Sequence, residues 1–161
     1  MSGIRLKTTI ELGAALKKFS SRTEQHKAGA TIFGVGESSH GCYLVVSGGL
    51  RLSIKSRCGN PIFELLAEHG CLVGLPATIN GHRYSLTCEA ASDVELAYLS
   101  RRDITTLVKH QPDAAIMLLD FLSTEVQSER TQFANPSTQA KMRSTDSFPR
   151  RVSEGIEPST Y

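Results

Sequence analysis

The chain has 161 residues, of which 40 % are hydrophobic and 21 % are charged, and its net charge is +2. These totals predict one globular domain with a hydrophobic core, and the weak charge argues against a nucleic-acid surface. No apolar run approaches the roughly 20 residues that a membrane-spanning helix needs, and the first residues lack the apolar core of a signal peptide. We therefore expect a cytoplasmic protein that does not bind a membrane.

The first 30 residues predict one helix and a polar connection. Apolar residues recur at helical spacing between residues 9 and 19, namely at Ile10, Leu12, Ala15, Leu16 and Phe19. Residues 20–30 are mostly polar and indicate a connection that leads to a turn at Ala28 and Gly29.

From residue 31 to residue 100, short β-rich runs alternate with turn residues. The runs cover residues 31–33, 42–46, 50–54, 62–67, 84–90 and 94–100. The clearest hairpin joins the third run to the fourth, with Cys58, Gly59 and Asn60 at its tip. Many short strands at this regular spacing favour an antiparallel sandwich or barrel.

Two helices are predicted after the strands. The first covers residues 101–109, with Ser100 as its N-cap, and the second runs from Pro112 to about Phe133. In the second helix, a heptad-like apolar seam is formed by Ala115, Leu119, Leu122, Val126 and Phe133. This seam fits either a helix packed on its own barrel or one half of a dimer interface. We expect the domain to span residues 1–134, and the tail over residues 135–161, rich in Ser, Thr and Pro, to be irregular and disordered.

No catalytic or metal-binding motif stands out in the sequence. The four cysteines form no CxxC pair, and the five histidines are scattered singly. There is no P-loop, no Ser–His–Asp arrangement and no pair of carboxylates suited to acid–base chemistry. We therefore predict that the chain is not an enzyme, with no catalytic residues and no metal. A cupin-like enzyme is the least favoured alternative, because only His40 fills a ligand place of the first cupin motif, and Cys42 stands where its second histidine belongs.

Several stretches occur in the order and spacing of a known family. The stretch "HKAGATIFGVGESSHGCYLVVSGGLRLSI" resembles the opening of a cyclic nucleotide-binding domain of the catabolite activator protein and FNR superfamily, at Gly29, Ile32, Phe33, Gly36, Tyr43, Leu44, Val45, Gly48 and Leu50. The stretch "AEHGCLVGLP" resembles the entry to that family's phosphate-binding cassette, and residues 85–126 resemble its closing strands and dimer helix. The resemblance implies an α+β fold, in which an antiparallel jelly-roll barrel carries a short N-terminal helix and a long C-terminal dimer helix at about residues 112–134.

The cassette stretch "GLPATINGHRYS" departs from the family pattern. In cyclic nucleotide binders, a glutamate follows the first glycine and takes a ribose hydroxyl, and an arginine directly before a Ser or Thr pairs with the phosphate. Here Leu75 replaces the glutamate after Gly74, and the next residue is a proline, which has no N–H to donate. With Ser85 kept in register, Tyr84 takes the arginine's place, and Arg83 points to the opposite face of the extended segment.

These departures predict weak or no binding of ordinary cyclic mononucleotides. Two roles stay open: a pocket for a different small-molecule effector, or a vestigial pocket in a dimer or interaction scaffold. The lining of such a pocket is expected to comprise Gly74, Leu75, Pro76, Ala77, Thr78, Arg83, Tyr84 and Ser85.

The output of the module is also expected to differ from that of the family's regulators. For those proteins, the resemblance implies a homodimer through the long helix and a following winged helix-turn-helix, which needs about 70 residues to bind DNA. Only 28 of the 161 residues follow Phe133. We therefore expect a homodimer and no DNA binding by this chain alone, as in a truncated regulator or a stand-alone sensor.

Overall fold

The computed structural model describes residues 6–134, and it describes side chains up to residue 125. The tail predicted for residues 135–161 lies outside this range. The described part contains four helices: α1 (Ile10–Phe19), α2 (Leu75–Asn80), α3 (Arg101–His110) and α4 (Pro112–Ala134). It also contains eight strands: β1 (Arg22–His26), β2 (Thr31–Phe33), β3 (Cys42–Ser47), β4 (Leu50–Lys55), β5 (Pro61–Ala67), β6 (Leu72–Val73), β7 (Thr87–Ala90) and β8 (Val94–Leu99).

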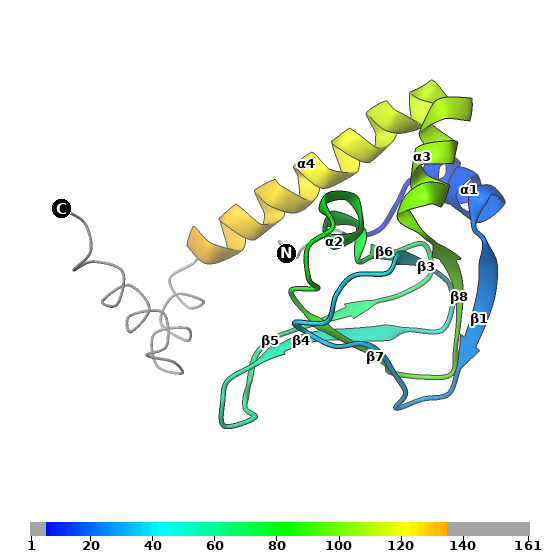
Figure 1. Ribbon diagram of the computed structural model, residues 1–161. Helices are drawn as coiled ribbons and strands as arrows, with labels where there is room; N and C mark the ends of the chain where they lie inside the picture. The colour runs from blue at the N-terminus through cyan, green and yellow to red at the C-terminus, as the bar shows by residue number, and fades with distance from the viewer. Residues whose placement is uncertain (1–5, 135–161) are drawn as a thin grey trace.

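The strands form two antiparallel sheets that face each other as a barrel (Figure 1). One sheet has the order β1-β8-β3-β6, and the other has the order β2-β7-β4-β5. Helices α1 and α3 lie together at one end of the barrel, whereas α4 runs from α3 along the molecule past α2 (Figure 1). The predicted α+β jelly-roll fold, with a short N-terminal helix and a long C-terminal helix, is confirmed.

Two hydrophobic clusters stabilise the fold, and β8 contributes to both. Leu96 and Tyr98 face the barrel interior, whereas Ala97 and Leu99 face the helices, as strand alternation requires. The barrel cluster is completed by residues from both sheets, among them Phe33, Tyr43, Val45, Leu50, Leu52 and Cys88. The helical cluster joins α1, α3 and α4 to the barrel through Leu12, Leu16, Leu107 and Leu118.

Side chains cap the starts of α1 and α3. Thr9 Oγ1 accepts the N–H of Leu12 at 3.1 Å at the start of α1. At the start of α3, Ser100 Oγ accepts the N–H of Asp103 at 3.1 Å, and the Asp103 carboxylate accepts the N–H of Ser100 at 2.9 Å. This reciprocal pair is a capping box, which typically stabilises a helix by about 1 kcal/mol. The prediction of Ser100 as an N-cap is confirmed.

The prediction of a polar connection over residues 20–30 is wrong, because part of it forms strand β1 at the edge of a sheet. Arg22 and Glu24 lie opposite Tyr98 and Leu96 of β8, on the face turned to the barrel. Arg22 Nε donates to Glu24 at 2.8 Å, and the Arg22 guanidinium lies 3.9 Å from the centre of the Tyr98 ring. A strand whose inward residues are charged lacks the apolar alternation by which strands are recognised.

Two short elements were not predicted from the residue pattern. Strand β6 has two residues and α2 has six, and both are too short to show a period. The run expected from residue 84 begins as a strand only at Thr87. Within residues 6–134, no helix has the length and apolar character that crossing a membrane requires.

Candidate ligand-binding cassette

The cassette is built around α2, which lies between β6 and β7. Gly74 precedes the helix with a φ of +85°, and Gly81 follows it with a φ of +73°. Both values favour glycine, because residues with a Cβ rarely adopt them. Thr78, which is 3 % exposed, donates through Oγ1 to the Gly74 carbonyl oxygen at 2.7 Å. The two glycines and this bond fix the ends of the short helix.

The first residues of α2 point in three different directions. Leu75 is fully buried, and its side chain lies in the helical cluster rather than in the barrel. Pro76 is exposed. Ala77 belongs to the barrel cluster, and its carbonyl oxygen accepts a hydrogen bond from Ser39 Oγ at 2.9 Å. The structure therefore does not bring these three side chains together around one space.

Tyr84 and Arg83 lie on opposite faces of the segment that follows α2. The Tyr84 side chain is 3 % exposed, whereas Arg83 and Ser85 are exposed. Arg83 Nη1 donates to the carbonyl oxygen of Gly36, in the loop between β2 and β3, at 2.8 Å. The alternation expected from the sequence is therefore observed, with Tyr84 turned inward and Arg83 turned outward.

Three backbone groups hold the Tyr84 hydroxyl. The N–H groups of His40 and Gly41 donate to it at 3.1 and 3.2 Å. The hydroxyl in turn donates to the Gly41 carbonyl oxygen at 2.6 Å. Burial raises the pKa of Tyr84, although the two N–H groups act in the opposite sense. The phenol is therefore protonated at neutral pH and keeps its donor.

The Tyr84 ring belongs to an aromatic cluster in the barrel interior. Its plane lies within 16° of the Phe33 plane, with the ring centroids 3.8 Å apart, and the His40 ring meets it edge-on at 5.5 Å. Tyr43 and Tyr98 continue the cluster, with centroids 5.4 Å apart. Apart from His40, each of these residues is at most 7 % exposed. Aromatic side chains of the protein itself therefore fill the space beside the cassette.

Sequence reasoning missed three residues that complete this site, namely Phe33, His40 and Gly41. Two of them bond to Tyr84 across more than 40 positions of sequence, so no local pattern reports the contact. Only glycine fits at position 41, because a Cβ there would lie 2.4 Å from Cε1 of Tyr98. The resemblance to a family included Phe33 among its matching positions but did not assign this region to the site.

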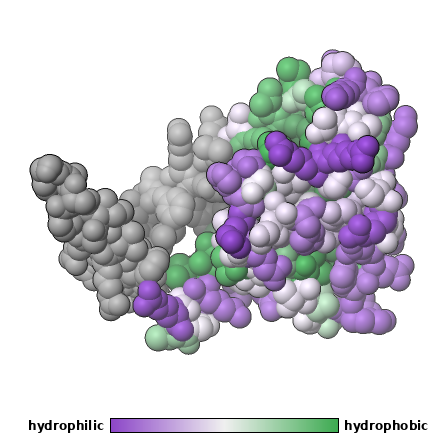
Figure 2. All heavy atoms as spheres, in the orientation of Figure 1, coloured by the Kyte–Doolittle hydropathy of each residue, from purple (hydrophilic) through white to green (hydrophobic). Residues whose placement is uncertain are grey.

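A second concave region, the α3–α4 groove, has a volume of about 510 Å³ and a mainly apolar lining. Residues of the predicted seam that line it are Ala115, Leu119 and Leu122. Ile79 of α2 lies along the same groove, and Leu119 is 60 % exposed. Figure 2 shows hydrophobic surface over the part of α4 nearer to α3. The side chains of Val126 and Phe133 lie outside the described residues.

Helix α4 packs on the rest of the chain through a face that adjoins the groove, since Leu118 belongs to both and Leu122 of the predicted seam packs against the helical cluster. The buried residues of this face are Ala114, Leu118 and Phe121, which belong to the helical cluster. Packing of α4 on its own barrel therefore does not use Leu119 of the predicted seam, which stays largely exposed.

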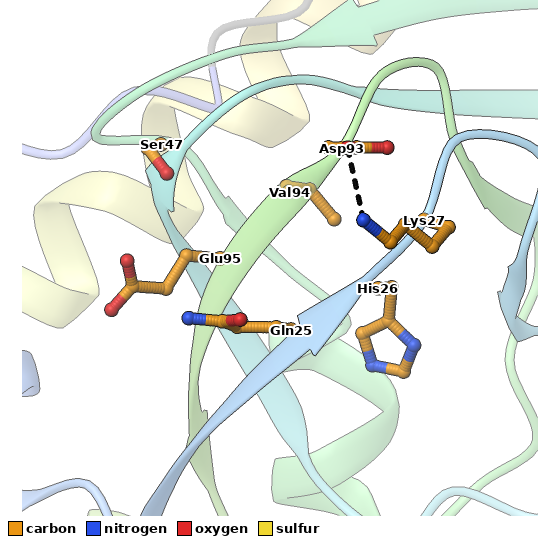
Figure 3. Close-up of a pocket in the computed structure, with 7 residues that line it drawn as sticks. All are labelled: Gln25, His26, Lys27, Ser47, Asp93, Val94 and Glu95. Carbon is orange, nitrogen blue, oxygen red and sulfur yellow. Dashed lines mark ion pairs between the residues drawn. The ribbon is translucent and has the colours of Figure 1, made fainter.

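Other depressions lie away from the cassette. One, of about 360 Å³, lies beside β1 and β8 and is lined mostly by polar side chains, with Lys27 Nζ 3.5 Å from Asp93 Oδ2 (Figure 3). Another, of about 400 Å³, lies between α1 and β3. Neither includes a residue predicted for the ligand pocket. In the part of the chain that the structure describes, no three His, Cys, Asp or Glu side chains are grouped as a metal site requires.

Residues 23–111 match the model of the cyclic nucleotide-binding domain family. This match covers more than half of the chain, which therefore belongs to that family. The patatin-like phospholipase domain-containing protein 7 of Mus musculus is 29 % identical over 100 residues. That alignment covers 62 % of this chain but only 7 % of the mouse protein.

Solved structures share the fold. The catabolite activator protein of Thermus thermophilus is similar with a TM-score of 0.69 and 24 % identity, over 78 % of this chain and 59 % of that one. Oxidized CprK in complex with o-chlorophenolacetic acid is similar with a TM-score of 0.67 and 16 % identity, over 83 % of this chain and 55 % of that one. At these identities the likeness shows the fold alone. Membership of the cyclic nucleotide-binding family supports a ligand-sensing regulatory role.

Proposed function

We propose that the chain is a ligand-sensing regulatory module whose cassette binds ordinary cyclic mononucleotides weakly or not at all. One observation carries this proposal: Tyr84 is buried in the cassette, and its hydroxyl takes the N–H groups of His40 and Gly41. The arginine of the cassette, Arg83, is exposed and donates to Gly36 instead. A cyclic phosphate placed here would find these two N–H groups engaged and the guanidinium turned away.

The two missing family contacts have a large cost in affinity. A ribose hydroxyl buried without its partner costs about 1–3 kcal/mol, and Leu75, in the glutamate's place, lies among the helices. A missing buried arginine–phosphate pair costs about 2–5 kcal/mol. Because about 1.4 kcal/mol is a factor of ten in affinity, these losses together weaken binding by several orders of magnitude.

The proposal has two versions, a different small-molecule effector and a vestigial pocket. In favour of an effector, CprK shares this fold and was solved with o-chlorophenolacetic acid, which is not a nucleotide. In favour of a vestigial pocket, Tyr84 and Phe33 already fill the interior beside α2. Both versions assign the module a regulatory rather than a catalytic role, without a metal, and place it in the cytoplasm.

Homodimerisation through α4 is the second part of the proposal. Leu119 is 60 % exposed, and with Leu122 it lines the apolar α3–α4 groove. Exposed apolar surface of this extent on a helix is a typical contact site, and an identical helix related by a two-fold axis would cover it. The module would pass its signal to a partner through this dimer, without contacting DNA itself.

A thermal-shift screen tests the first part, because a ligand that binds only the native state raises its melting temperature. The screen should contain cyclic mononucleotides, cyclic dinucleotides, other nucleotides and small aromatic acids. We expect no shift with cyclic AMP or cyclic GMP at micromolar concentration. A dose-dependent shift with either nucleotide at micromolar concentration would contradict the proposal.

A size measurement by light scattering tests the second part. We expect a dimer in the micromolar range. A monomer that persists at high protein concentration would count against the α3–α4 groove as a dimer interface.

A further inference from the structure

We propose that the slot now filled by Tyr84 is a site for aryl alcohols and that Tyr84 is its built-in occupant. This slot, the Tyr84 slot, is formed by Phe33, His40, Gly41 and Gly74. The proposal rests on the proposed function and deepens it, because it names the chemistry that fills the cassette in place of a nucleotide.

The polar groups of the slot match a hydroxyl and not an anion. They comprise two donors, the N–H groups of His40 and Gly41, and one acceptor, the Gly41 carbonyl. A hydroxyl accepts two hydrogen bonds and donates one, so it satisfies all three groups at once. The ionised phosphate of a cyclic nucleotide, which is a diester, has no hydrogen to donate, and neither has a carboxylate. Its oxygen, placed where the hydroxyl lies, would meet the Gly41 carbonyl oxygen at 2.6 Å with no hydrogen between them.

The walls of the slot match a flat aromatic ring. Phe33 offers a parallel face 3.8 Å from the Tyr84 centroid, and His40 closes one side edge-on. On another side lies Gly74, where a Cβ would come within 3.3 Å of Tyr84 Cε1. A side chain at position 74 would therefore narrow the slot, in which the ring lies against Phe33 and His40.

The main chain of Tyr84 is bonded on both sides, so position 84 is held beside the slot. Its N–H donates to the Glu37 carbonyl oxygen at 3.0 Å, and its carbonyl oxygen accepts the N–H of Gly36 at 2.9 Å. The native chain therefore supplies its own occupant, which competes with any free aryl alcohol for the slot. Free aryl alcohols would bind only when the Tyr84 side chain is removed.

The variant Tyr84→Ala, with p-cresol as the probe, tests this site, because p-cresol is the tyrosine side chain as a free molecule. We expect the variant to melt several degrees below the native protein, and p-cresol to raise its melting temperature in a saturable way. Toluene, which lacks the hydroxyl, and benzoate, whose carboxylate has no hydrogen to donate, should raise it much less. The native protein should not respond to p-cresol. Equal shifts with toluene and p-cresol, no shift with p-cresol, or an equal shift in the native protein would overturn the proposal.

If Tyr84→Ala does not fold, Tyr84→Phe keeps the ring and removes only the hydroxyl. Amide hydrogen exchange should then accelerate about tenfold or more at His40 and Gly41, which lose their acceptor, and stay unchanged at Tyr84, whose N–H still bonds to Glu37. Unchanged exchange at His40 and Gly41 would overturn the proposal.

The proposed function is tested separately, by the thermal shift of the native protein with cyclic nucleotides. If p-cresol raises the melting temperature of Tyr84→Ala but the native protein binds cyclic AMP tightly, only the proposed function is contradicted. If nucleotides do not shift the melting temperature of the native protein and p-cresol does not shift that of the variant, only the aryl-alcohol site is contradicted.

Discussion

Tyr84 stacks on Phe33 with the ring centroids 3.8 Å apart and the planes within 16° of parallel. Phe33 ends β2, in the sheet β2-β7-β4-β5, and Tyr84 follows the cassette helix α2. The stack therefore ties the cassette to the barrel wall. In a barrel that binds its ligand between cassette and wall, such a contact occupies the space where the ligand would lie.

Removing the partner ring should loosen both the barrel and the cassette. We expect Phe33→Ala to lower the free energy of unfolding by about 3–5 kcal/mol, because a fully buried aromatic ring is lost and Tyr84 loses its stacking partner. Urea denaturation measures the change. Phe63→Ala on β5 is the matched control, since that ring is only partly buried, and it should cost less than half as much. Equal losses in the free energy of unfolding of the two variants would show that the Phe33–Tyr84 stack does not contribute more than a partly buried ring.

Gly41 should tolerate no side chain. A Cβ there would lie 2.4 Å from Cε1 of Tyr98 and 2.7 Å from the Leu99 carbonyl oxygen. We expect Gly41→Ala to destabilise the fold by about 1–3 kcal/mol through overpacking. At Gly49 the nearest atom to an added Cβ is the Ala67 carbonyl oxygen at 3.8 Å, so Gly49→Ala should change stability by no more than about 0.5 kcal/mol. Urea denaturation of both variants measures the change in the free energy of unfolding. A Gly41→Ala variant as stable as the native protein would contradict the packing described.

Glu24 on β1 should make stability depend on pH in the acid range. Burial alone would raise the pKa of its carboxyl, but hydrogen bonds from His26 and Arg22 and their charges together hold it below its ordinary value. A lowered folded-state pKa contributes stability above the unfolded-state pKa of about 4.3, and this stability is lost as the pH falls through the folded-state pKa. The native protein should therefore exceed Glu24→Gln in stability at neutral pH.

Denaturation of both proteins from pH 7 to pH 3 checks this dependence. The difference between them should shrink on acidification, starting near pH 5. A difference that is constant over this range would mean that the Glu24 carboxylate has no pH-dependent role.

The α3–α4 groove should govern the oligomeric state. We expect Leu119→Lys to shift the protein from dimer to monomer, because it places a charge on an apolar surface that the second copy would bury. Light scattering over a concentration series measures the shift. Leu66→Lys replaces another exposed leucine, 53 % exposed on β5, and should leave the dimer intact. If both variants remain dimeric, the interface lies elsewhere.

The sequence predicts the parts of this fold whose signals are local. The β4–β5 hairpin and the helix start at Ser100 each rest on residues close together in the chain. Strand β1 was missed because Arg22 and Glu24 neutralise each other on its inward face, so it carries no apolar alternation.

The candidate site could be predicted only in part, for the same reason. The opposite directions of Arg83 and Tyr84 follow from the period of an extended segment, and the structure shows them. The partners of the Tyr84 hydroxyl do not follow from the sequence, because His40 and Gly41 are brought to it only by the barrel. The placement of Leu75 among the helices is likewise a tertiary effect, since a six-residue helix is too short to define its buried face.

The measurement that tests the central claim most directly is calorimetric titration of the native protein with cyclic AMP and cyclic GMP. With Tyr84 seated between Phe33 and the N–H groups of His40 and Gly41, we predict no saturable heat at micromolar nucleotide. Saturable binding of either nucleotide with a micromolar dissociation constant would contradict the account, because it would require Tyr84 to leave its slot.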